Sequence, residues 1–153
     1  ADRFARRVMR EITANTPDDT FAVGEKLGAA LAGGEVILLY GGLGAGKTLL
    51  TKGILNQLGF DIDEVTSPSF ALVNLYKTRL FDVYHIDLWR LDGALDAAEA
   101  VGLSEILEVE KAVTIIEWAD RIKTFALPAG AISVFINGDG DEERSIRIEG
   151  LRS

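Results

Sequence analysis

Cysteine is absent from this chain of 153 residues, and histidine occurs once, as His85. The missing cysteines exclude disulfides, thiolate metal sites and cysteine nucleophiles, and a single histidine excludes a multi-histidine metal centre. Long hydrophobic runs are also missing, since the longest, Val36–Tyr40, is far shorter than the ~20 apolar residues that span a membrane. Acidic residues outnumber basic ones by 24 to 16, and the resulting net charge of −8 disfavours a broad nucleic-acid-binding surface.

The first ten residues carry four arginines without an apolar stretch behind them, so they do not fit a secretory signal peptide. We therefore expect a cytoplasmic protein with no membrane association. A length of 153 residues with 48% apolar side chains can bury one hydrophobic core. These values predict a single domain over residues 1–153.

The hydrophobic pattern changes period often along the chain, which is typical of a mixed α/β domain. The run Val36–Tyr40 lies close to glycines on both sides and fits a buried strand, because it is short and has no polar face. We expect an α/β fold with a mixed, mostly parallel central sheet, flanking helices and a C-terminal β-hairpin. The expected strands are residues 5–13, 36–40, 70–76, 79–86, 112–117, 132–136 and 145–148, and the expected helices run from Thr16-Pro17 to Gly33-Gly34, over 47–58 and over 95–107.

A Gly-rich turn at residues 41–48 matches G-x-x-x-x-G-K-[ST], the phosphate-binding loop or P-loop. Its glycines let successive N–H groups turn inward around an anion, and the helix that follows adds its positive N-terminal end. Lys47 can reach the β- and γ-phosphates, and the Thr48 hydroxyl can ligate Mg²⁺. The expected phosphate-binding residues are Gly42, Leu43, Gly44, Ala45, Gly46, Lys47, Thr48 and Leu49.

Two carboxylates are candidates for the metal side of this site. Glu117 ends a second apolar strand, where a parallel strand delivers an acid to the same sheet edge as the loop. Strand alternation puts His85 and Asp87 on one face, so Asp87 is placed to bind Mg²⁺ or to orient water. The alternatives are a solvated acid at a strand end for Glu117 and a capping acid for Asp87.

Three further features remain open between two interpretations. His85 is either a packed, hydrogen-bonded residue or a general base. Trp118, next to Glu117, is either a core residue or a contact to the nucleotide or a partner. The polar stretch Thr66-Ser67-Pro68-Ser69 is either a switch that senses the γ-phosphate or a simple turn.

Four motifs in order carry a resemblance to one family. They are Gly-Gly-Leu-Gly-Ala-Gly-Lys-Thr at 41–48, Thr-Ser-Pro-Ser-Phe at 66–70, His-Ile-Asp-Leu-Trp-Arg at 85–90 and Ile-Glu-Trp at 116–118. Over nearly its whole length the chain resembles the TsaE (YjeE) family, the bacterial ATPase of tRNA threonylcarbamoyladenosine biosynthesis. The P-loop is shared by many families, whereas the motifs at 85–90 and 116–118 are far more specific to this one.

The resemblance implies a P-loop NTPase fold and slow ATP hydrolysis with Mg²⁺. It places the loop lysine and threonine of the family on Lys47 and Thr48, the motif aspartate on Asp87, and the metal-side glutamate and neighbouring tryptophan on Glu117 and Trp118. It further implies a TsaB–TsaD heterodimer as partner, which modifies adenosine 37 of tRNAs that read codons beginning with A. The ATPase would support turnover of that complex, with tRNA contacted mainly through the other subunits.

The chain departs from the family pattern at three positions: Gly42 replaces a common Asp, Ser69 a common Thr and Trp89 a common Tyr. None of these removes a donor that phosphate binding needs. Gly42 bears only on a partner contact at that point.

Two other functions fit the P-loop. A small metabolite kinase would usually need a lid with several arginines, yet only Arg79 and Arg90 lie between the loop and Glu117. A nucleotide-gated binding module with incidental hydrolysis would keep the same loop and acid. A GTPase is disfavoured because neither Asn-Lys-x-Asp nor Asp-x-x-Gly occurs. Candidate adenine contacts, from expected proximity alone, are Thr16, Thr20 and Arg144.

Overall fold

The chain folds into one β-sheet with helices on both faces, as the computed structural model describes it for residues 7–42, 46–65, 73–88, 101–119, 127–128, 130–138 and 142–152. Its strands are β1 (Arg7–Ala14), β2 (Val36–Tyr40), β3 (Val73–Lys77), β4 (Asp82–Asp87), β5 (Val113–Glu117), β6 (Ile132–Asn137) and β7 (Arg144–Arg152). Its helices are α1 (Pro17–Ala29), α2 (Lys47–Gln57), the short 3₁₀ helix η2 (Ile62–Glu64) and α4 (Leu103–Leu107). Within the described residues, no helix is both long and apolar enough to span a membrane.

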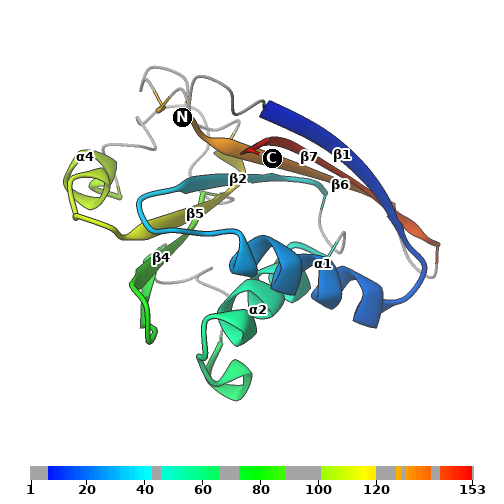
Figure 1. Cartoon of the computed structure of the whole chain (residues 1–153), viewed down its shortest axis with the longest axis horizontal. Coiled ribbons are helices and arrows are strands. Elements are labelled where there is room, and N and C mark those ends of the chain that lie inside the picture. Colours follow the sequence, from blue (N-terminus) through cyan, green and yellow to red (C-terminus); the bar gives the residue numbers. More distant parts are fainter. Residues whose placement is uncertain are drawn as a thin grey trace.

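The sheet is mixed, and its spatial order is β1-β7-β6-β2-β5-β4-β3 (Figure 1). The four central strands β6, β2, β5 and β4 are parallel, whereas β1, β7 and β3 pair antiparallel at the two edges. Strands β6 and β7 form the expected C-terminal hairpin. Because the central strands are parallel, β2, β5 and β4 bring their carboxyl ends to one edge of the sheet, and this edge carries the candidate site.

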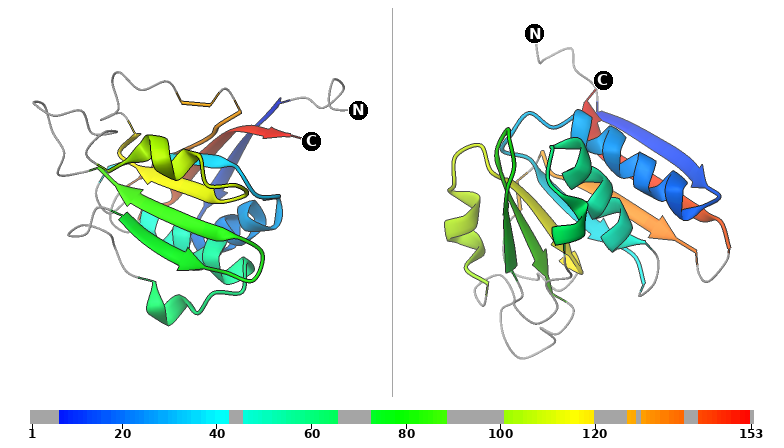
Figure 2. Two further views of the ribbon diagram at one scale, coloured as in Figure 1. Left: turned by 90° about the vertical axis from the view of Figure 1, so that its left-hand side faces the viewer. Right: turned by 90° about the horizontal axis from the view of Figure 1, so that it is seen from below.

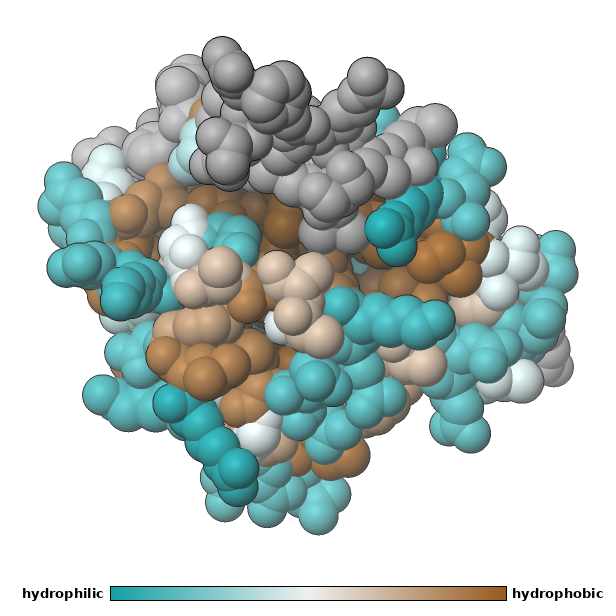
Figure 3. Space-filling view, in the orientation of Figure 1, coloured by the Kyte–Doolittle hydropathy of each residue, from teal (hydrophilic) through white to brown (hydrophobic). Residues whose placement is uncertain are grey.

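Each face of the sheet is covered by an apolar layer. Ile37 and Leu39 of β2 belong to the cluster under α1 and α2, whereas Val36 and Leu38 belong to the cluster under α4. This division follows from the two-residue period of a strand buried on both faces. Figure 2 shows α4 on the opposite side of the sheet from α1 and α2. The space-filling view shows many hydrophilic residues around smaller apolar areas (Figure 3).

Helices α1 and α2 approach each other through glycines. A Cβ atom built on Gly53 would lie 2.2 Å from the carbonyl oxygen of Phe21, and one on Gly24 would lie 2.2 Å from that of Leu50. A Cβ on Gly28 would lie 2.9 Å from the carbonyl oxygen of Ile54. The backbones are therefore closer than any larger residue allows, so that α1 fixes the position of the helix that follows the P-loop.

The first helix is shorter than the sequence predicts, because it ends at Ala29 and does not continue to Gly33-Gly34. The N–H group of Ala30 donates to Leu27 O at 3.1 Å, which tightens the last turn. The carboxylate of Glu35 then accepts the N–H groups of Ala32 and Gly33 at 2.7 and 2.8 Å. This side-chain capture holds the following backbone outside the helix.

A continuous helix over 95–107 is also wrong, because α4 begins only at Leu103. Gly102 has φ +69°, a left-handed conformation that a helix interior cannot contain. Residues 95–100 lie outside the described residues. The expected strands 70–76 and 79–86 are observed as β3 and β4, and residues 70–72 lie outside the described residues. The later start of β4 follows from a turn at residues 78–81, in which Thr78 Oγ1 donates to Phe81 O at 2.6 Å.

Candidate functional site

The loop expected to bind phosphate joins the carboxyl end of β2 to the start of α2. Gly41 and Gly42 follow β2 directly, and residues 43–45 lie outside the described residues. Gly46 is the N-cap of α2 and has φ +111°, a conformation that favours glycine. The first N–H groups of α2 have no partner within the helix, so its positive end adjoins the loop.

Lys47 connects the loop to the end of a neighbouring strand. Its side chain is buried, with 6% exposure, and its Nζ donates to the carbonyl oxygen of Gly41 at 2.7 Å. The same Nζ lies 4.0 Å from the centroid of the Trp118 ring, in a cation–π contact. The next two residues are more open, because Thr48 is exposed and Leu49 is half-buried. The ammonium group of Lys47 therefore contacts both Gly41, at the start of the loop, and Trp118, which follows β5.

The two candidate carboxylates are direct neighbours. Asp87 ends β4, Glu117 ends β5, and the two residues are paired in the parallel register. The N–H group of Leu88 donates to Glu117 O at 3.1 Å, which extends this pairing past the strand end. Asp87 is 7% and Glu117 4% exposed. Two buried acids thus lie at the same sheet edge as the P-loop, as the strand order requires.

Behind this acidic pair lies His85, whose ring is fully buried. Its Nε2 lies 2.5 Å from Glu117 Oε2. From the sequence, His85 is either a packed residue or a general base, and its direct bond to Glu117 was not predicted. Alternation places His85 and Asp87 on one face, but the bond to Glu117 also requires the register between β4 and β5.

Trp118 takes part in both the core and the site. It packs against the cluster under α4 while its ring lies beside Lys47. Its φ of +60° is a left-handed conformation that costs a bulky side chain roughly 1–2 kcal/mol. Strand alternation alone would point the side chain of Trp118 to the α4 face. The left-handed backbone at Trp118 ends this alternation, and the ring lies beside Lys47 as well as against the cluster under α4.

The three candidate adenine contacts lie in different places. Thr16 caps α1, because its Oγ1 accepts the N–H of Asp19 at 3.2 Å. Thr20 is buried, and its Cγ2 lies 3.4 Å from where a Cβ on Gly46 would be, so it packs against the P-loop. Arg144 begins β7 and donates to Glu142 O at 2.5 Å. Thr20 is therefore the one of the three that these contacts bring to the loop.

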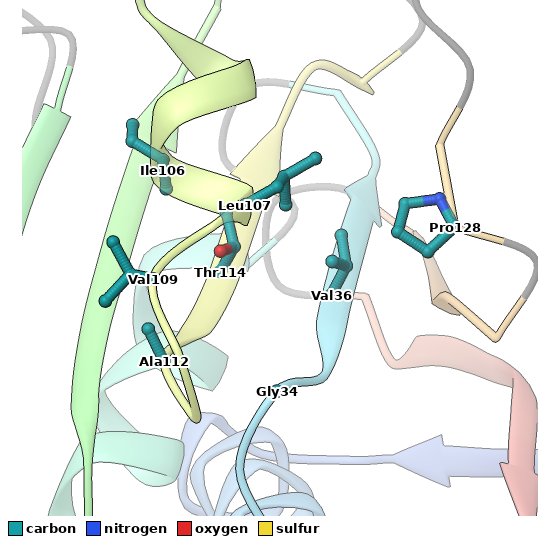
Figure 4. Close-up of a pocket in the computed structure, with 8 residues that line it drawn as sticks. All are labelled: Gly34, Val36, Ile106, Leu107, Val109, Ala112, Thr114 and Pro128. Carbon is teal, nitrogen blue, oxygen red and sulfur yellow. The ribbon is translucent and has the colours of Figure 1, made fainter.

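Two predicted features lie outside the described residues: the stretch 66–70, and Trp89 with Arg90. A recess of about 70 Å³ lies elsewhere, lined by residues that include Val36, Leu107 and Thr114 (Figure 4). Val36 and Thr114 are register partners at the starts of β2 and β5. The recess is therefore at the opposite end of the parallel strands from the P-loop and is separate from the candidate site.

Comparisons with known proteins identify similar sequences of one family. A family model described as threonylcarbamoyl adenosine biosynthesis protein TsaE matches residues 14–146. The tRNA threonylcarbamoyladenosine biosynthesis protein TsaE of Bacillus subtilis is 35% identical over 130 residues, which cover 85% of this chain and 78% of the relative. The protein of the same name from Treponema pallidum is 35% identical over 130 residues, covering 85% and 93%.

A solved structure is similar over nearly the whole chain. The crystal structure of YdiB from Bacillus subtilis superposes with a TM-score of 0.70 and 31% sequence identity, covering 97% of this chain and 88% of that one. Its fold is that of a P-loop NTPase, and the mixed α/β sheet described above is the same fold. The sequence match and the structural match together show that the chain belongs to the TsaE family of threonylcarbamoyl adenosine biosynthesis proteins.

Proposed function

We propose that this protein is a magnesium-dependent ATPase that supports threonylcarbamoyladenosine modification of tRNA. The observation that carries the proposal is the meeting of three elements at one sheet edge: the P-loop after β2, the N-terminus of α2, and the buried acids that end β4 and β5. Anion-binding and cation-binding groups are thus adjacent, as an ATP–Mg²⁺ complex requires.

The phosphate side of the site consists of the P-loop backbone, Lys47 and the start of α2. Backbone N–H groups and the helix end favour negative charge, and they need no side chain for specificity. Lys47 Nζ donates a hydrogen bond to Gly41 O and lies over the Trp118 ring. We expect a bound triphosphate to draw this ammonium group toward the β- and γ-phosphates.

The donor set fits magnesium. Hydroxyl and carboxylate oxygens are the ligands that Mg²⁺ prefers, and it usually takes one or two carboxylates together with substrate phosphates and water. Thr48 is exposed at the start of α2, and Asp87 and Glu117 lie side by side at the end of the sheet. Among the described residues no three His, Cys, Asp or Glu side chains form a metal cluster, so the phosphates would complete the site. When bound, Mg²⁺ would neutralise phosphate charge during transfer of the γ-phosphoryl group to water.

The role in tRNA modification rests on the family. Relatives that cover most of this chain are named tRNA threonylcarbamoyladenosine biosynthesis proteins. From the resemblance in the motifs, we infer that the partner is a TsaB–TsaD heterodimer and that ATP hydrolysis supports its turnover. A net charge of −8 suits this division of labour, because tRNA contact then falls mainly to the other subunits.

The test compares the wild type with Lys47→Ala, with Glu117→Gln and with the matched control Lys26→Ala, whose side chain is exposed on α1. Lys47→Ala should weaken ATP binding by about 10–100-fold, because it removes a charged hydrogen-bond donor. Glu117→Gln should bind ATP without metal normally but lose Mg²⁺-dependent hydrolysis. Isothermal titration calorimetry and phosphate release measure both. Equal hydrolysis by the wild type and Lys47→Ala would reject the site.

A second test addresses the pathway. Depleting the protein in its own cells should lower threonylcarbamoyladenosine in tRNA, as measured by nucleoside mass spectrometry. Re-expression of Lys26→Ala should restore the modified nucleoside, and Lys47→Ala should not. Undiminished threonylcarbamoyladenosine after depletion would reject the role in tRNA modification while leaving the ATPase proposal to the binding test.

A further inference from the structure

We propose that His85 is a positioning residue that holds the Glu117 carboxylate in the orientation that the magnesium side of the site needs. The inference deepens the proposed function and rests on it. The proposed function gives His85 no role. The positioning role is inferred from where its ring lies, behind the Glu117 carboxylate.

The geometry joins two strands beneath the site. In the parallel register His85 of β4 pairs with Ile115 of β5, two residues before Glu117. Its ring is therefore on the inner side of Glu117, away from the strand ends, and its Nε2 lies 2.5 Å from Glu117 Oε2. Both side chains are buried, at 0% and 5% exposure, so the bond is shielded from water. One carboxylate oxygen is held from behind, which leaves the other for the metal side.

The second carboxylate oxygen supports this division. Within the described part of the chain, the bond to His85 is the one hydrogen bond of the Glu117 carboxylate. A carboxylate held by a single oxygen keeps one rotational state and still presents its second oxygen. Ligating carboxylates in metal sites are commonly held in this way by neighbouring hydrogen-bond donors.

The other nitrogen of His85 argues against a simple core residue. His85 Nδ1 is buried and has no hydrogen-bond partner among the described residues. Its surroundings are largely those of a core, with the Tyr76 ring centroid 6.5 Å away and Ile115 beside it in register. An apolar residue of similar size would fill this position without leaving a polar atom unpaired. The hydrogen bond from Nε2 to Glu117 therefore accounts for a histidine at this buried position.

The tautomer follows from the same contacts. A neutral imidazole has one donor and one acceptor, and a carboxylate only accepts. Because Glu117 accepts, we assign the hydrogen of this bond to Nε2. His85 acts through Glu117 and takes no direct part in ATP hydrolysis. Replacing His85 should therefore weaken the effect of Mg²⁺ on nucleotide affinity and leave metal-free nucleotide binding unchanged.

The experiment measures the affinity for ADP by calorimetry, with and without Mg²⁺, together with the Mg²⁺ concentration that half-saturates ATP hydrolysis. The variants are His85→Leu, which removes the donor at similar volume, and His85→Gln, whose amide can place a donor near the position of Nε2. The matched control is Thr114→Val, which changes a buried polar residue of β5 at the far end of the strand.

We expect ADP affinity without metal to stay within about 2-fold of the wild type in every variant. The gain in affinity that Mg²⁺ brings should fall about 10–100-fold in His85→Leu, and return to within a few-fold of normal in His85→Gln. Thr114→Val should behave as the wild type. In a Glu117→Ala background, His85→Leu should have no further effect, because His85 acts through that carboxylate.

Three results would overturn the inference: an unchanged metal response in His85→Leu, a loss in His85→Gln as large as in His85→Leu, or an undiminished effect of His85→Leu in the Glu117→Ala background. If His85→Leu does not fold, His85→Asn takes its place, because its amide is too short to reach Glu117 and should show the same loss. A wild type that binds no nucleotide, or that ignores Mg²⁺, would instead reject the proposed function.

Discussion

Replacing Gly53 by alanine should destabilise the protein, although alanine is the better helix former. The new Cβ would lie 2.2 Å from the carbonyl oxygen of Phe21 and 3.0 Å from both the Glu25 nitrogen and the Gly24 Cα. All three are backbone atoms, so no side-chain rotation relieves the contact. Helices α1 and α2 must move apart or tilt, and their shared core must repack.

The magnitude follows from two opposing effects. Overpacking a tight contact costs about 1–3 kcal/mol. Alanine recovers up to about 1 kcal/mol of helix propensity over glycine. Because the 2.2 Å contact is with backbone, the cost lies at the upper end of that range, and the net loss in the free energy of unfolding should be about 2 kcal/mol. That loss lowers the melting temperature of a chain of this size by roughly 4–8 °C.

The assay is thermal and urea unfolding of Gly53→Ala beside a matched variant, Gly28→Ala. The Cβ of Gly28→Ala would lie 2.9 Å from Ile54 O, 3.0 Å from the Cβ of Gln57 and 3.2 Å from Ile54 Cα, so its clash is milder than the 2.2 Å contact of Gly53→Ala and should cost less stability. A Gly53→Ala protein as stable as the wild type would refute the inference that the close helix contact is needed. Lower ATP affinity in Gly53→Ala is also expected, because α2 carries Lys47.

Three further changes test other parts of the fold by the same unfolding measurements. Thr16→Ala should cost about 1 kcal/mol, because it removes the side-chain cap of α1, and a loss below ~0.3 kcal/mol would contradict the capping role. Lys111→Gly should stabilise the protein by up to about 1 kcal/mol, because this exposed residue has φ +62°, and a lower melting temperature would show that the strain is absent. Ile54→Ala should cost about 2–5 kcal/mol, because Ile54 is fully buried in the core under α1 and α2, and a near-neutral result would disprove its place there.

The elements around the P-loop could be predicted from the sequence because local signals agree there. The apolar run Val36–Tyr40 is observed as β2 with the expected bounds, and the helix expected over 47–58 is observed as Lys47–Gln57. Where the structure differs, long-range or side-chain contacts decide. Glu35 captures the backbone after α1, and Gly102 takes a left-handed conformation just before α4. Neither the Glu35 hydrogen bonds nor the conformation of Gly102 produces a periodic pattern of apolar residues in the sequence.

The site was only partly predictable. Alternation along β4 puts His85 and Asp87 on one face, as expected, and the parallel order puts Glu117 beside Asp87. That this face lies under α1 and α2 is known only from the structure. The bond from His85 to Glu117 depends on the register between two strands that are far apart in sequence, which local pattern does not encode. The contact of Lys47 with Trp118 depends on the positive φ at Trp118, a conformation that favours glycine and is rare for a bulky residue.

The central claim is that residues 41–48 hold a triphosphate whose magnesium is shared with the acids at the ends of β4 and β5. A crystal structure with a non-hydrolysable ATP analogue and Mg²⁺ tests it most directly. We predict the phosphates inside the loop, Lys47 Nζ moved from Gly41 O onto a phosphate oxygen, and the ion beside Thr48 and Glu117. Phosphates bound elsewhere, or an ion remote from Glu117, would contradict this account.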